Sequence, residues 1–154
     1  MKYCKLLVLV LFVFLLVGCS KEEKVKTCKV QSIENESGYQ ITTKYDIYSN
    51  GKIVSRVNMN QVIQSDKKDI LEYYQKEYNS MYKKYNKTYG GYTYDIRIDN
   101  NKLICNVNIH YKKLNRKKYI EDNTGLKKFI NKNNHYFTVD GIVKMYESLG
   151  ASCK

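Results

Sequence analysis

Alternation of apolar and polar residues around one Asn-Gly pair constrains the fold of this chain most strongly. Apolar side chains recur with a period of two in residues 39–47 and 53–63, and Asn50-Gly51 lies between the two runs. That period is typical of a strand with one buried face, and Asn-Gly is the strongest short hairpin signal. The same period returns in residues 92–98 and 103–111, and residues 27–34 form a candidate first strand. The sequence therefore predicts an antiparallel sheet of about five strands.

Two helices are expected beside this sheet. The spacing of apolar side chains from Ser65 to Gly90 is helical, with Ser65 as N-cap and Gly90 as the stop. A second helix is expected at about residues 139–149, with Thr138 as N-cap and Gly150 beyond its end. Short helical pieces are expected between residues 114 and 134. Strands with one polar face leave that face to water, so the prediction is an α+β fold with two main helices packed on one face.

The composition sets the size and the character of the core. A chain of 154 residues is sufficient for one small domain, which excludes a large multidomain enzyme, a polytopic membrane protein and a repeat solenoid. The chain has 16 Tyr but no Trp and no Pro. Aliphatic residues are few outside the first segment, so the core must draw heavily on tyrosine rings.

The N-terminal segment has the pattern of a bacterial lipoprotein signal. A positive start precedes the apolar run 6–17, which as a helix spans about 18 Å and is too short for a hydrocarbon core of roughly 30 Å. Leu16-Val17-Gly18-Cys19 resembles the lipobox, which implies a diacylglyceryl group on the Cys19 thiol and cleavage before it. We expect residues 1–18 to be removed, 19–26 to form a charged flexible tether and 27–154 to form one domain. The alternatives are a plain signal peptide or an uncleaved short anchor.

Three cysteines remain after Cys19 is lipidated. Cys105 lies on the apolar face of its strand and is expected to be a buried thiol. Cys28 and Cys153 lie at the two ends of the domain, which often meet, in a compartment where disulfides persist. We predict a Cys28–Cys153 disulfide; the alternative is two free thiols.

No sequence motif points to catalysis or to a cofactor. His110 and His135 have no partner at metal-ligand spacing, and Gly90-Gly91 is explained as a helix stop. We therefore expect no catalytic residue, no metal, no cofactor and no enzymatic activity.

The charge points to anionic partners. The formal net charge is +12, and Lys and Arg cluster at 83–84, 112–113, 116–118 and 127–128. Because the signal directs the chain out of the cytoplasm, anionic envelope polymers or lipid headgroups are the expected partners, not nucleic acid. The working surface would be the exposed sheet face or the basic region 112–128. The alternative is that an AT-rich coding sequence produces the lysines without a function.

Several of these features together resemble the YehR-like family of small bacterial lipoproteins, a domain of unknown function. They are the lipobox, Thr27-Cys28-Lys29, a Tyr-rich helix from Leu71 and the ending Leu149-Gly-Ala-Ser-Cys153-Lys154. The resemblance covers about residues 15–154, implies the same disulfide and α+β fold, and carries no catalytic residues. Cys105 and the strong basic charge depart from the typical pattern.

The expected function follows from the anchor and the charge. It is a non-enzymatic binding or structural module, held by its lipid on the extracytoplasmic face of the cell membrane. The alternative is an accessory lipoprotein that binds a small ligand or a peptide.

Overall fold

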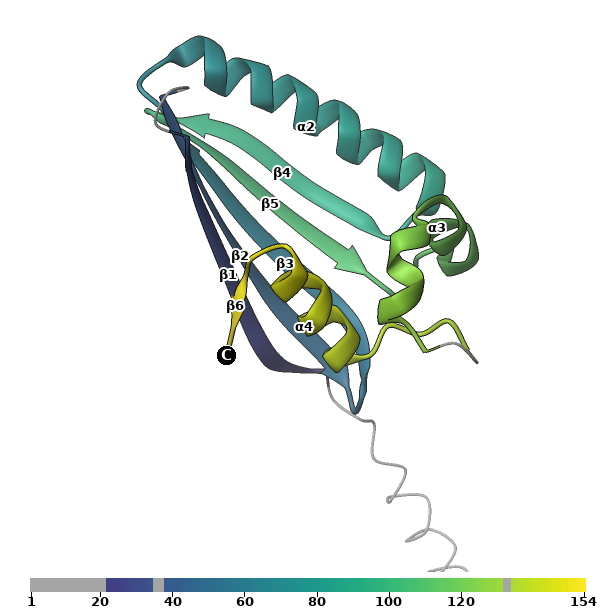
Figure 1. The fold of residues 1–154 in the computed structure, drawn as a ribbon. Helices are drawn as coiled ribbons and strands as arrows, with labels where there is room; N and C mark the ends of the chain where they lie inside the picture. Colours follow the sequence, from purple (N-terminus) through teal and green to yellow (C-terminus); the bar gives the residue numbers. More distant parts are fainter. Residues whose placement is uncertain (1–21, 35–37, 132–133) are drawn as a thin grey trace, which may run out of the picture.

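The chain folds around one antiparallel sheet with helices on a single face (Figure 1). The computed structural model describes residues 22–34, 38–131 and 134–154. Its sheet has the strand order β4-β5-β3-β2-β1-β6, and every neighbouring pair is antiparallel. The strands are β1 (Glu23–Glu34), β2 (Tyr39–Asn50), β3 (Ile53–Gln64), β4 (Tyr92–Asp99), β5 (Lys102–His110) and β6 (Ser152–Cys153).

The sheet has six strands where the sequence predicted about five. The additional strand, β6, is only two residues long and pairs through Cys153 with Cys28 of β1. A strand of two residues has no period that a sequence pattern could show. The prediction of an α+β fold on an antiparallel sheet is otherwise confirmed.

The two long helices are α2 (Lys68–Tyr89) and α4 (Val139–Ser148), with α3 (Arg116–Asp122) and the 3₁₀ helix η1 (Thr124–Phe129) between them. The Thr138 hydroxyl caps α4 by accepting from the Gly141 N–H at 3.1 Å, as predicted. The predicted cap of α2 is wrong, because α2 begins at Lys68. Ser65 instead contacts the Gly38 carbonyl and the Lys67 N–H, two residues before the cap position.

Tyrosine rings fill much of the space between sheet and helices, as predicted. Tyr82 of α2 lies against Met59 of β3, and the rings of Tyr146 on α4 and Tyr45 on β2 stack at 3.9 Å. Met59 and Tyr45 are register partners, so both helices cover the same face of the sheet. Burial raises the pKa of these core tyrosines, among them Tyr78, whose pKa reaches about 12.

The first strand begins four residues earlier than the sequence predicted. β1 starts at Glu23, so residues 23–26, which were expected in the tether, pair with β2. Cys28 and Cys153 form the predicted disulfide, and Cys105 is a buried free thiol. Cys19 and the predicted signal 1–18 lie outside the described residues. Within the described ranges, every helix is too short or too polar to cross a bilayer.

Candidate functional site

Near the β2–β3 hairpin, β3 leaves β5 and forms a hydrogen bond to another segment of the chain. β3 pairs with β5 as far as Arg56 and His110, and Ser55 is then bulged out of the β2 ladder. The first residues of β3 have a different partner, because the Val54 N–H donates to the Phe137 carbonyl at 2.8 Å. The segment after β5 and the segment before α4 thus bond to neighbouring residues of β3, and their side chains line one groove.

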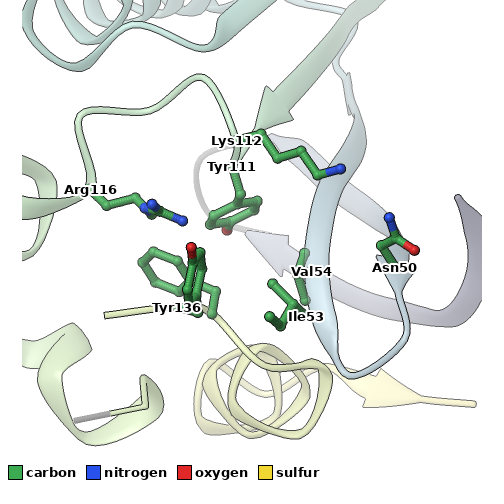
Figure 2. A pocket seen from close by; sticks show the side chains of 8 residues that line it. Asn50, Ile53, Val54, Tyr111, Lys112, Arg116 and Tyr136 are labelled. Carbon is green, nitrogen blue, oxygen red and sulfur yellow. The ribbon is translucent and has the colours of Figure 1, made fainter. Parts of the chain in front are cut away.

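This groove has a volume of about 460 Å³ and combines apolar walls with basic and amide side chains (Figure 2). It is lined by Asn50, Ile53, Val54, Tyr111, Lys112, Arg116, Tyr136 and Phe137. The rings of Tyr111 and Phe137 are 4.7 Å apart and form its buried floor. Ile53 is 37% exposed, so an apolar side chain of the strand remains open to a ligand.

Two cations lie at the groove. Figure 2 shows Arg116 directed toward Tyr136 and Lys112 extending toward the start of β3. The Arg116 guanidinium lies 4.2 Å from the centre of the Tyr136 ring, a cation–π distance that holds its planar fork in place. No carboxylate in the described part of the chain forms an ion pair with Lys112 or Arg116. Their charges are therefore available to an anion.

The bulge behind the groove also fixes the start of the described chain. The Ser55 hydroxyl lies 2.6 Å from a Glu22 carboxylate oxygen, and Arg56 forms an ion pair with the same carboxylate at 3.0 Å. The hydrogen bond from Ser55 and the charge of Arg56 lower the pKa of Glu22 below its ordinary value of 4.5. The Ser55 carbonyl accepts from the Tyr111 N–H at 2.9 Å, so one bulged residue links Glu22 to the floor of the groove.

The open sheet face is the other predicted working surface. Its charged side chains are partly paired, as Lys44 is with Asp46 at 2.8 Å and Arg97 is with Asp95. Asn60 donates to Asn106 at 2.7 Å across the same face. Lys44 and Arg97 are therefore less available to an anionic ligand than Lys112 and Arg116, which have no carboxylate partner in the described chain.

His110, His135 and Cys105, the residues that could have suggested catalysis, lie in three different surroundings. His110 lies at the end of β5 near Arg56 and Lys113, and burial together with these cations lowers its pKa. His135 shares a hollow of about 280 Å³ with Glu121, but no hydrogen bond or ion pair joins the two. Burial raises the pKa of the Cys105 thiol to about 12. Among the residues placed by the structure, no three His, Cys, Asp or Glu side chains gather as metal ligands.

The sequence anticipated part of the groove. It placed Lys112 and Arg116 in the basic region 112–128, but it did not place Ile53 or Tyr136 beside them. These residues come from segments more than 80 positions apart, joined by the bridge between Ile53 and Thr138. No local pattern carries that pairing.

Comparisons with known proteins reach only the fold. No protein-family model matches the sequence, and no curated protein does. The NMR structure of the E. coli YehR protein aligns with a TM-score of 0.54 at 18% identity, over 88% of this chain and 92% of that one. An NMR structure of a Streptococcus pneumoniae TIGR4 protein aligns with a TM-score of 0.48 at 14% identity, over 90% of this chain and 88% of that one.

The likeness to YehR supports the predicted resemblance in its fold alone. At 18% identity it transfers neither a ligand nor a site. Membership of the YehR-like lipoprotein family therefore stays a prediction.

Proposed function

We propose that this protein is a non-enzymatic binding module of the bacterial cell envelope, anchored by a lipid on Cys19 at the extracytoplasmic face of the membrane. Its ligand is anionic envelope material, either a wall polymer or a lipid headgroup. The observation that carries this proposal is the groove with Lys112 and Arg116, two cations without a carboxylate partner in the described chain. The anchor rests on the lipobox sequence that ends at Cys19.

The chemistry of the groove supports binding over catalysis. A guanidinium held over a ring and a neighbouring ammonium suit phosphate or carboxylate groups, which Arg contacts through two parallel hydrogen bonds. The groove holds no nucleophile beside a general base, the arrangement that covalent catalysis requires. The free thiol of Cys105 is buried, and its raised pKa keeps it protonated at neutral pH.

A small ligand or a peptide is the second candidate. A volume of about 460 Å³ lies within the range of roughly 300–1,000 Å³ that small-molecule sites occupy. Apolar walls with a few polar groups are also typical of such sites.

Binding can be tested with a chain that begins at residue 20, which retains every element that the structure describes but cannot be lipidated. It is mixed with isolated wall fragments, with phosphatidylglycerol vesicles and with phosphatidylcholine vesicles, at low and at high salt. We expect salt-sensitive binding to at least one of the two anionic materials. Absence of such binding from both would contradict the proposed function.

A further inference from the structure

Glu22, the first residue that the structure describes, lies at the same end of the sheet as the groove. Glu22 is fixed by Ser55 and Arg56, while Val54, one residue before Ser55, lines the groove. The β2–β3 hairpin forms this end, and the β4–β5 turn lies at the opposite end of the sheet (Figure 1). A chain held through residues before Glu22 is therefore held at its groove end.

The tether is short. Cys19 precedes Glu22 by three residues. A fully extended chain spans at most about 3.6 Å per residue, so about 11 Å separates the two Cα atoms at most. This length is comparable to the lipid headgroup region, and lipidation of Cys19 leaves the hairpin end within reach of the phosphates.

The side chains that line the groove, of which Lys112 and Ile53 are exposed and Arg116 and Tyr136 half-buried, suit an interface of lipid and water. Lys112 and Arg116 supply positive charge, which is attracted to the anionic surface of a bilayer. Tyr136 supplies an aromatic ring with a polar edge, the kind of side chain that is enriched at headgroup depth. Ile53 adds an exposed apolar contact between them.

We propose that the groove end docks on the membrane that holds the anchor, with the phosphate of an anionic lipid headgroup bound by Lys112 and Arg116. This inference rests on the proposed function and names its ligand. The domain would then lie with α2's first turn and the β4–β5 turn farthest from the bilayer.

The absence of Trp from the chain permits a direct test with single reporters. Tyr136→Trp places a reporter at the groove and keeps a ring for Arg116. Tyr73→Trp places one near the far end, where the native ring is 61% exposed. Both lipidated full proteins are reconstituted in phosphatidylcholine vesicles with or without phosphatidylglycerol, each containing a lipid with a spin label on its headgroup, and fluorescence quenching is measured.

The anchor alone keeps the groove reporter nearer the headgroups, so we expect it to be quenched more than the far reporter in both kinds of vesicle, with a clearly larger excess in anionic vesicles. Lys112→Gln with Arg116→Gln should reduce the excess in anionic vesicles to its value in neutral ones. The matched pair Lys67→Gln with Lys102→Gln removes the same charge from the far end and should keep the larger excess. Circular dichroism of each variant verifies that it is folded.

An excess of the same size with and without phosphatidylglycerol, or an additional excess in anionic vesicles that survives the loss of Lys112 and Arg116, would overturn the inference. A fluorescence shift of the groove reporter on adding inorganic phosphate to neutral vesicles, without additional quenching in anionic ones, would assign the groove to a soluble phosphate and also overturn it. Binding of wall fragments without additional quenching in anionic vesicles would leave the proposed function intact and reject the membrane ligand alone.

Discussion

Gly141 shows how closely a single residue determines the packing of α4 against η1. A Cβ atom at this position of α4 would lie 1.9 Å from the Phe129 carbonyl oxygen, a backbone atom that cannot turn aside. We expect Gly141→Ala to force α4 away from η1 and to lower the free energy of unfolding by roughly 1–3 kcal/mol. The midpoint of urea denaturation measures this loss.

Gly125 provides the matched control for that substitution. A Cβ atom there meets nothing within 4 Å, so Gly125→Ala is expected to change stability by less than about 0.5 kcal/mol. If the two alanine substitutions destabilise the protein equally, the contact between a Cβ atom at position 141 and the Phe129 carbonyl does not determine stability.

Among the elements, β1 depends on the negative charge of Glu22, the residue directly before it. The lowered pKa of Glu22 means that its ionised form stabilises the fold, fully above about pH 4.5 and progressively less as the pH falls through the native pKa. We expect the protection factor of the Lys24 amide, taken against its intrinsic exchange rate at each pH, to fall in acid as Glu22 is protonated and releases Ser55 and Arg56. NMR titration of the Glu22 carboxyl and of this amide measures both events.

Glu22→Gln is the control for the acid effect. It removes the titrating group, so the protection factor of Lys24 should be lower at neutral pH and should lose the fall in acid that Glu22 causes. A native Glu22 that titrates at or above 4.5 would contradict the explanation.

Elements with a local signal were predictable, and those formed by distant segments were not. Thr138 and Gly150 bound α4 because a cap and a stop are properties of neighbouring residues. The Asn-Gly pair predicted the hairpin, but Asn50 remains in β2 and Gly51, with φ of 65°, is the first loop residue. The Ser55 bulge and the pairing of Val54 with Phe137 have no signature in the sequence, so the groove itself could not be predicted.

At the scale of the whole molecule, the two ends of the chain are fixed to one sheet. The Cys28–Cys153 disulfide spans 125 positions, and on the chain-entropy account it stabilises the fold by roughly 4–5 kcal/mol. It also joins β6 to β1, the strand that follows the predicted anchor.

The intact mass of the protein extracted from its native membrane tests the central claim, a lipid-anchored and disulfide-closed domain. We expect a chain that begins at Cys19 and carries a diacylglyceryl group. Alkylation should modify no thiol in the native protein, Cys105 alone after denaturation, and Cys28, Cys105 and Cys153 after denaturation with reduction. A mass that retains residues 1–18 without lipid, or Cys28 and Cys153 reactive before reduction, would contradict the account.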